Sequence, residues 1–535
     1  MTRFDYVIVG AGPAGCVLAN RLSADPSVNV LLLEAGERDS NPLIAMPRGF
    51  NQLLADRAFA WHYPTRPFGP SQQPEVWVRG KTLGGSSAVN GMIYTRGQRA
   101  DYDALEALGN PGWSWDDDML PAFRAIEDNE LGGSEVRGAG GPLQVSTLDG
   151  ADDPLLEDVL AAGAELGWRR LRDVNEADGE RIGLSTATIR DGRRVSAADA
   201  FLHPITDRPN LTVALETVVD RVVLKGGRAT GVQGRRNGQG VEARAAREVI
   251  LATGGLATPK LLQLSGIGPA DALRSAGVDV VLDSPNVGAR LREHRAFMVQ
   301  FRLKEDLGYN KVFATESGLR AAQAQYEATR QGPLAGPPTD IVAFLKTRPE
   351  LDRPDAQLQI APYSMLPYEP GKALEIEREP GMLCIGFMLR PDSEGSLRIT
   401  SAEPDAPLDI DVNYLASDYD RTTMAGVFRA IRRLFATEPL AERIDHETAP
   451  GDAVQTDDQI VDAALTTGTC GYHTIGTCAM GPDADDVVDP QLRVRGVANL
   501  RVVDASVLPI MVSGNLAGPV SALAWRAADL ILETA

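Results

Sequence analysis

The chain has 535 residues, of which 43% are hydrophobic and 24% are charged, proportions typical of a globular protein with a sizeable core. Its 73 acidic and 53 basic residues give a formal net charge of −20. Because this charge repels nucleic-acid phosphates and anionic lipid headgroups, we expect neither nucleic acid nor a membrane as a partner.

The N-terminal segment predicts a strand, a helix and a second strand. Residues 4–9 are mostly apolar, the turn 10–15 reads Gly-Ala-Gly-Pro-Ala-Gly and opens a helix ending near Ser23, and the strand 28–33 closes on Glu34. In this fingerprint Gly10 allows the tight turn, Gly12 lets a pyrophosphate approach, and Gly15 lets helix pack on strand. The sequence therefore predicts dinucleotide binding, with Glu34 on a ribose, and leaves NAD and FAD both open.

Two more glycine-rich segments, 80–97 and 254–269, are each expected to form a loop, and an ordinary surface loop is the alternative interpretation of each. Residues 211–218 and 248–252 predict strands that precede the second of them. Residues 395–400 and 408–412 alternate as half-buried strands do, which indicates an antiparallel sheet. The tail predicts a strand over 500–504 and a final amphipathic helix from near Pro519 to near Leu532.

A histidine motif, Cys-Gly-Tyr-His-Thr-Ile-Gly-Thr-Cys, lies at 470–478, and Asn515 follows it in the tail. Only five histidines occur in the chain. The unperturbed pKa of histidine, about 6.5, suits proton transfer at neutral pH, although a single histidine is more often structural. His473 and Asn515 become catalytic candidates only in the context of the glycine segments.

Together, the glycine segments, the histidine motif and the tail resemble the glucose-methanol-choline (GMC) oxidoreductases, a family of flavoproteins, over nearly the whole chain. The resemblance implies an α/β fold in which a Rossmann-like FAD-binding domain is interleaved with a substrate domain, whose antiparallel β-sheet with flanking helices roofs the flavin. We expect the FAD-binding domain over 1–150, 200–290 and 468–535, and the substrate domain over 151–199 and 291–467.

Carried over position by position, the resemblance implies an FAD site and a catalytic pair. The cofactor-binding residues are Gly10, Gly12, Gly15, Glu34, Ala35, Gly85, Ser86, Asn90, Met92, Val218, Asp504 and Ala505. His473 and Asn515 match the pair that faces the flavin. Some relatives have a histidine just before the Asn90 position that bonds covalently to the flavin; this chain has Val89, so we expect noncovalent FAD.

The implied activity is FAD-dependent oxidation of a primary alcohol to the aldehyde, with His473 as general base and Asn515 orienting the alcohol oxygen. Oxygen or another acceptor would reoxidise the flavin. We expect an aromatic or furanic alcohol. Alternatives are a choline or sugar alcohol dehydrogenase, a hydroxynitrile lyase, a light-dependent decarboxylase and a non-catalytic flavin-binding protein. Aromatic residues make up only 6% of the chain, and we expect Phe313, Tyr363, Tyr368 and Phe387 in the core and not in a cage around an ammonium group.

Two segments depart from the family pattern. Relatives usually read Asn-x-Asn-x-Pro-Thr after the histidine motif, whereas this chain has Leu516, Ala517 and Val520 around its Asn515, which puts the tuning of the flavin in doubt. Residues 292–294 read Arg-Glu-His where many relatives have Gln-Asp-His, and we interpret this segment as structural.

The remaining predictions concern cysteine, metal and location. Cys16, Cys384, Cys470 and Cys478 form no CxxC pair and are expected to be reduced and mostly buried, and no metal site is apparent. The first strand occupies the place of a leader's apolar segment, and no apolar run of about eighteen residues occurs, so we expect a cytoplasmic protein. The sequence does not indicate an oligomeric state.

Overall fold

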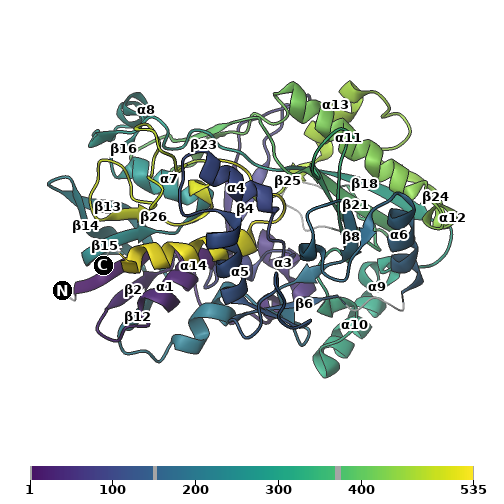
Figure 1. Ribbon diagram of the computed structural model, residues 1–535, viewed down its shortest axis with the longest axis horizontal. Helices are drawn as coiled ribbons and strands as arrows, with labels where there is room; N and C mark the ends of the chain where they lie inside the picture. The colour runs from purple at the N-terminus through teal and green to yellow at the C-terminus, as the bar shows by residue number, and fades with distance from the viewer. Residues whose placement is uncertain (1–2, 149–152, 368–374, 534–535) are drawn as a thin grey trace.

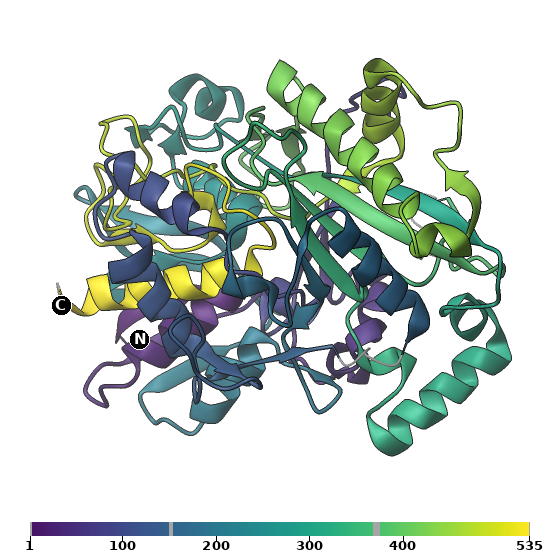
Figure 2. The same cartoon turned by 45° about the vertical axis from the view of Figure 1, so that its right-hand side comes forward.

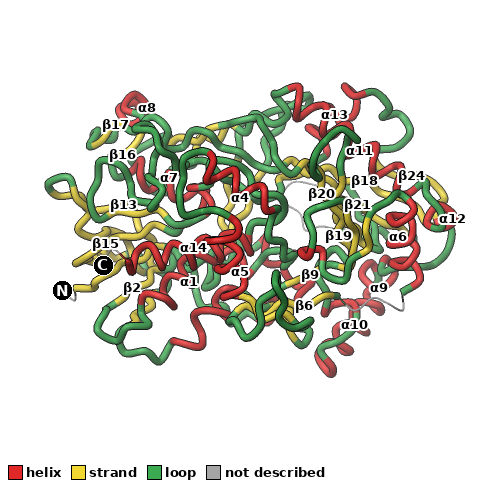
Figure 3. The backbone as a smooth tube through the Cα atoms, in the orientation of Figure 1, coloured by secondary structure: helices red, strands yellow, loops and turns green. Residues whose placement is uncertain are grey.

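The computed structural model describes residues 3–148, 153–367 and 375–533 (Figure 1). Its strands gather mainly in two large sheets, which appear as the yellow groups toward the left and right of Figure 3. One sheet has seven strands and the other eight. This arrangement confirms the predicted fold class, whereas the exact domain boundaries stay a prediction.

The seven-stranded sheet has the order β12-β2-β1-β15-β14-β13, and β26 also pairs with β15. The strands are β1 (Arg3–Val9), β2 (Val30–Leu33), β12 (Leu211–Ala214), β13 (Thr217–Lys225), β14 (Arg228–Arg236), β15 (Gln239–Leu251) and β26 (Leu500–Val502). The pairs β1–β2, β1–β15, β2–β12 and β15–β26 are parallel. These central strands are nearly continuous apolar runs because helices cover a parallel sheet on both faces.

The helix that follows the first strand packs beside the last helix of the chain. Helices α1 (Pro13–Leu22) and α14 (Ala517–Glu533) run side by side over the sheet (Figures 1 and 2). Arg21 of α1 forms an ion pair with Asp529 of α14 at 2.5 Å. Its guanidinium also lies over the ring of Trp525 in a cation–π contact, 4.3 Å from the ring centroid. The tail is thereby fixed to the N-terminal fingerprint.

The eight-stranded sheet has the order β24-β18-β21-β20-β19-β8-β7, with β25 on β18, and is antiparallel except at β7–β8. Its strands are β7 (Arg169–Arg170), β8 (Arg181–Leu184), β18 (Arg295–Leu303), β19 (Ile341–Leu345), β20 (Ala356–Ala361), β21 (Gly381–Met388), β24 (Ile444–Ala449) and β25 (Thr469–Cys470). Helices α6 (Pro154–Glu165), α11 (Asp418–Phe435) and α13 (Asp457–Thr467) share an apolar core with one face, in which Phe297 stacks on Phe428. The other face is turned toward the histidine motif.

Smaller elements complete the described fold. They include β3 (Ala60–Pro64), β4 (Val76–Gly80), α4 (Arg99–Ala107), α5 (Leu120–Ile126), β5 (Glu127–Asn129), β6 (Leu143–Thr147), α8 (Ala270–Ser275), α9 (Asn310–Ala314), α10 (Glu316–Thr329) and α12 (Leu440–Arg443). Among all helices of the described residues, 3–148, 153–367 and 375–533, none combines the length and the apolarity that crossing a bilayer requires.

Three predicted elements differ in the structure. The strand expected over 211–218 is two strands, β12 and β13, because the chain breaks at Glu216, whose φ of 54° is left-handed. The loop expected from residue 254 is mostly helix α7 (Gly254–Leu264). The strands β22 (Ser396–Ile399) and β23 (Leu408–Asp411) pair antiparallel as predicted, but they form a separate two-stranded sheet packed on α7 and do not belong to the eight-stranded sheet.

Candidate functional site

The predicted dinucleotide residues meet at the carboxyl edge of the parallel strands. Gly10 has φ 98°, and a Cβ there would lie 2.6 Å from the carbonyl oxygen of Ala252. A Cβ at Gly15 would lie 1.8 Å from the carbonyl oxygen of Gly10, so helix and strand can approach only with glycine here. A Cβ at Gly12, in contrast, meets no protein atom within 4 Å, and no side chain caps the helix that starts after it. The helix N-terminus is therefore open to an anion.

Glu34 ends β2 beside this turn. Its carboxylate is buried and accepts hydrogen bonds from the backbone N–H of Ala11 at 2.9 Å and of Gly36 at 2.8 Å. Ala35 follows it, and the N–H of Thr217, the neighbour of Val218, donates to the carbonyl of Glu34 at 2.8 Å. The structure thus brings the predicted ribose-binding and adenine-binding residues together.

The second glycine segment packs directly on the first. The N–H of Gly84 donates to the carbonyl of Ala11 at 2.9 Å, and a Cβ at Gly85 would lie 2.6 Å from the Cα of Gly12. The hydroxyl of Ser86 accepts from the N–H of Gly80 at 3.1 Å. Both loops therefore border the same open space.

Farther along that segment, buried Arg194 holds the backbone. Its guanidinium donates to the side-chain oxygen of Asn90 at 2.8 Å and to the carbonyl of Asn90 at 2.7 Å. The N–H of Met92 donates to Asn90 Oδ1 at 3.0 Å, and Met92 itself has φ 61°. These contacts fix the backbone that is predicted to follow the ribityl chain and the ring.

The tail joins the third glycine segment, 254–269, through Asp504. Its Oδ2 accepts from the N–H of Gly254 at 2.8 Å and from the hydroxyl of Thr258 at 2.6 Å, and its Oδ1 accepts from the N–H of Ser506 at 2.9 Å. Ala505 lies next to it at the start of a short 3-10 turn. Burial raises the pKa of Asp504, whereas these three hydrogen bonds favour its charged form.

The two catalytic candidates face each other, as the sequence predicts. His473 Nε2 lies 3.4 Å from Asn515 Nδ2, and both side chains are partly exposed. Thr95, at the end of the second glycine segment, accepts the N–H of Asn515 at 2.8 Å and donates to its carbonyl at 3.1 Å. The cofactor segment thereby positions the backbone of Asn515.

A second histidine, which the sequence did not single out for chemistry, contacts the first. His294 Nδ1 lies 2.8 Å from His473 Nδ1, and His294 Nε2 lies 2.9 Å from the carbonyl oxygen of Leu389. Buried Glu293 accepts the backbone N–H of His294 at 2.9 Å and of His473 at 2.6 Å through the same oxygen, Oε1. The segment that we interpreted as structural therefore also places a ring against His473.

Two glutamines of the sheet orient Asn515. The Nε2 atoms of Gln357 and Gln359 donate to Asn515 Oδ1 at 3.0 Å and 3.1 Å. Both lie on β20 two residues apart, so they occupy the same face of the strand. With its oxygen occupied twice, Asn515 turns Nδ2 toward His473.

Burial sets the protonation state of the histidines. It lowers the pKa of His294 to about 4 and lowers that of His473 well below its usual value, with His294 and Arg79 adding to the effect on His473. Because burial and nearby positive charge both disfavour imidazolium, both rings are neutral at pH 7. A neutral His473 can accept a proton.

Apolar and aromatic side chains also lie near the pair. Phe387, expected only as a core residue, lies with its ring 4.8 Å from His294 and 6.1 Å from His473. The paired strands place Met298, Ile385 and Val342 in the same row as Gln359. Tyr363 is buried in another apolar cluster, against which Phe313 packs, and both rings lie near the guanidinium of Arg48; Tyr368 lies outside the described residues.

Ala517 and Val520 replace the second asparagine and the threonine of the family pattern; Val520 is buried with Leu516 in the core beside the seven-stranded sheet, and Ala517 is partly buried. All four cysteines are buried and free, and burial raises the pKa of Cys470 and Cys478, so both thiols are protonated at neutral pH. A redox role for them gains no support.

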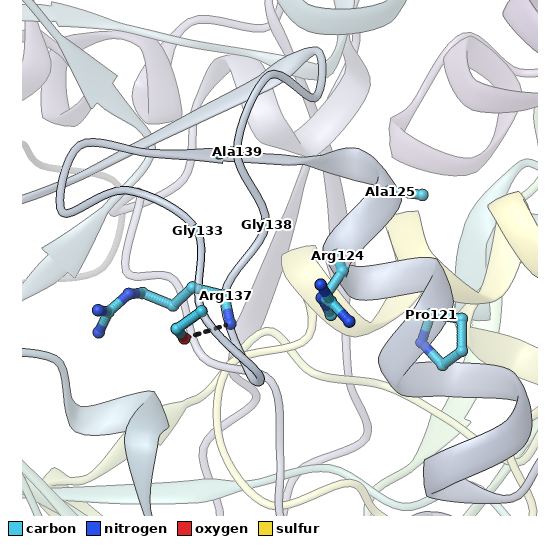
Figure 4. Close-up of a pocket in the computed structure, with 8 residues that line it drawn as sticks. Pro121, Arg124, Ala125, Gly133, Arg137, Gly138 and Ala139 are labelled. Carbon is cyan, nitrogen blue, oxygen red and sulfur yellow. Dashed lines mark hydrogen bonds between the residues drawn. The ribbon is translucent and has the colours of Figure 1, made fainter.

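Two further features do not include His473, Asn515 or His294. Asp39, Asp199 and His203 each offer one atom within 4.8 Å of the others, a group that the sequence did not reveal, and Asp39 already pairs with His203 at 2.8 Å. A surface hollow of about 690 Å³ lies between α5 and the loop 133–139, with Arg124 and Arg137 at its border (Figure 4). No predicted site residue lines this hollow.

Comparison with known proteins gives the following similarities. A family model described as GMC oxidoreductase matches residues 4–296, and its C-terminal counterpart matches 391–524. The alcohol dehydrogenase [acceptor] of Pseudomonas putida is 38% identical, with 99% of this chain and 96% of that protein covered. Human mitochondrial choline dehydrogenase is 38% identical, with 99% and 90% covered. The crystal structure of pyridoxine 4-oxidase from Mesorbium loti superposes with a TM-score of 0.88 at 31% identity, covering 99% of each chain.

Proposed function

The chain belongs to the GMC oxidoreductase family, whose members are FAD-dependent enzymes that oxidise alcohols, and on this premise we propose that it oxidises a primary alcohol to the aldehyde with His473 as general base. The observation that carries the proposal is the facing pair of a neutral histidine and an oriented asparagine, His473 Nε2 and Asn515 Nδ2, 3.4 Å apart.

The residues present fit the cofactor of the family. The uncapped N-terminus of α1 and the space beside Gly12 suit a pyrophosphate, and Gly85 borders the same space. Glu34 has the position and charge to accept hydrogen bonds from ribose hydroxyls. When bound, FAD supplies the acceptor for the hydride that leaves the alcohol carbon. Because Val89 offers no atom for a covalent bond at the expected position, we infer noncovalent FAD.

His473 and Asn515 would then both contact the alcohol oxygen, each with a different role. His473 takes the hydroxyl proton on Nε2, a contribution of roughly 10²–10⁴-fold for a general base. Asn515 donates from Nδ2 to the same oxygen, which holds the alcohol in line and stabilises negative charge as it develops. Gln357 and Gln359 support this by keeping the amide oxygen of Asn515 engaged.

The surroundings favour an uncharged aromatic or furanic substrate. The row of Met298, Ile385 and Val342, together with Phe387, offers an apolar surface close to the histidines. The nearby charges that shift the histidines belong to Arg79 and Arg390, which disfavours a quaternary ammonium alcohol such as choline. The likeness to pyridoxine 4-oxidase supports the same class, because pyridoxine is an alcohol on an aromatic pyridine ring.

Anaerobic mixing of the purified holoenzyme with alcohols tests the proposal. We expect benzyl alcohol and 5-hydroxymethylfurfural to bleach the visible flavin absorbance, and choline and glucose to leave it unchanged. Bleaching by choline or glucose alone would contradict the substrate class. A spectrum that no alcohol bleaches, combined with cleavage of mandelonitrile, would favour the lyase alternative. Fast recovery on admitting air would identify an oxidase, and slow recovery a dehydrogenase.

The pH dependence follows from the lowered pKa of His473. Activity requires the unprotonated ring, so kcat/KM should fall as the pH drops through the pKa of His473 and stay level above it. Because burial lowers this pKa, the fall should lie below about pH 6.5, the ordinary value for histidine. Measuring kcat/KM for benzyl alcohol from about pH 5 to about pH 9 checks this, with FAD content recorded at each pH. A midpoint above pH 7 would contradict it.

A further inference from the structure

We propose that His294 is a positioning residue that fixes the tautomer of His473 and so keeps Nε2 of His473 free for the alcohol proton. The inference rests on the proposed role of His473 as base. It comes from a continuous series of hydrogen-bond contacts that runs from Gln357 and Gln359 through Asn515, His473 and His294 to the carbonyl of Leu389.

The carbonyl of Leu389 sets the direction of this series, because a carbonyl oxygen can only accept. His294 Nε2, 2.9 Å from that oxygen, must therefore carry a hydrogen. Burial lowers the pKa of His294 to about 4, so the ring is neutral at pH 7 and its Nδ1 has no hydrogen. At 2.8 Å from this acceptor, His473 Nδ1 must be the donor. A neutral His473 that carries its hydrogen on Nδ1 has a lone pair on Nε2.

The opposite end of the series agrees with this direction. Asn515 Oδ1 accepts from both glutamine amides, which leaves Nδ2 to face His473 Nε2. If His473 Nε2 carried a hydrogen, that hydrogen would point at the amide hydrogens of Asn515, and the two donors would repel each other. An alcohol between the pair would therefore donate its hydroxyl hydrogen to His473 and accept from Asn515, which is the arrangement that base catalysis requires.

Several contacts hold His294 in place, and none of them gives its ring a partner for proton transfer to the substrate. Glu293 Oε1 binds the backbone of both histidines, and the N–H of Gly471 donates to the carbonyl of His294 at 2.8 Å. A Cβ at residue 471 would lie 2.7 Å from the Cβ of His294, so glycine allows the two segments to meet. Since His294 is fully buried and its two ring nitrogens are both engaged, it acts through His473 and does not contact the substrate.

Two variants, His294→Asn and His294→Leu, have side chains of similar size. Comparing them separates the effect of the hydrogen bond to His473 from the effect of packing. In His294→Asn the amide oxygen stands where Nδ1 was and can accept from His473, whereas His294→Leu offers no acceptor. Tautomer-setting partners of a catalytic histidine are worth up to about 10⁴-fold in kcat. We expect His294→Leu to have a kcat/KM roughly 10²-fold below that of His294→Asn, with equal FAD content and closely similar Tm values for the two variants.

The tautomer can also be read directly in the wild-type holoenzyme. Five histidines make ¹⁵N-histidine labelling tractable, and the signals of His473 are those that disappear in His473→Ala. We expect Nδ1 of His473 to be protonated and Nε2 to be unprotonated at pH 7. Protonation on Nε2 would overturn the inference even if His294→Leu failed to fold, as would equal kcat/KM in the Leu and Asn variants. Near-normal turnover of His473→Ala would instead refute the proposed base.

Discussion

Replacing His473 by alanine should lower kcat/KM for the alcohol by roughly 10²–10⁴-fold while the protein keeps its FAD. The physical reason is that the variant lacks the only described ring whose Nε2 faces the amide of Asn515. FAD should stay bound because the cofactor residues lie on other segments, and because the backbone N–H of residue 473 can still donate to Glu293. Steady-state kinetics and the flavin absorbance of the same preparation measure both quantities.

His446→Ala is the matched control for this variant. His446 is exposed, pairs with Asp445 at 2.9 Å on β24, and has no contact with the histidine pair. The control should therefore match the wild type in kcat/KM, FAD content and Tm. Turnover of His473→Ala within a few-fold of the control would contradict the role of His473 as base. Loss of FAD from His473→Ala alone would show that this ring supports the cofactor site.

The sequence was sufficient to predict that the expected dinucleotide-binding residues lie together, because their arrangement depends on local patterns. Gly10 adopts a left-handed φ, and a Cβ at Gly15 would collide with a backbone carbonyl oxygen. Both requirements appear in the sequence as glycines at fixed spacings. The same holds for the strand that ends on Glu34. These features require only neighbouring residues, so they could be interpreted without a structure.

The contacts that support the proposed catalytic pair, His473 and Asn515, could not be predicted in the same way, because they depend on which strands become neighbours. Gln357 and Gln359 reach Asn515 because β20 lies inside the eight-stranded sheet, and His294 reaches His473 because residue 294 directly precedes β18. The one available signal was the spacing of two glutamines by two residues on a strand otherwise apolar, which places both on one face. The helix at 254–264 was missed because its two glycines resemble a loop, whereas its buried leucines pack as a helix does.

Alanine at Gly12 and alanine at Gly15 should separate cofactor binding from folding. At Gly12 the backbone has φ −76°, which alanine adopts without strain, and its Cβ meets no protein atom within 4 Å. Apo Gly12→Ala should therefore keep the wild-type Tm. Because the added methyl enters the space that we assign to the pyrophosphate, its Kd for FAD should rise by at least about tenfold, which corresponds to about 1.4 kcal/mol.

Gly15→Ala should act on the protein itself. Its Cβ would lie 1.8 Å from the carbonyl oxygen of Gly10, so α1 and β1 must move apart, and overpacking of this kind costs about 1–3 kcal/mol of the free energy of unfolding. The apo Tm should fall in this variant only, whereas titration with FAD should show weaker binding in both. If apo Gly12→Ala bound FAD as tightly as the wild type, the pyrophosphate would lie elsewhere, and the open helix N-terminus would need another explanation. If its apo Tm also fell, Gly12 would be required for folding, and the loss of FAD could not be assigned to a blocked cofactor space.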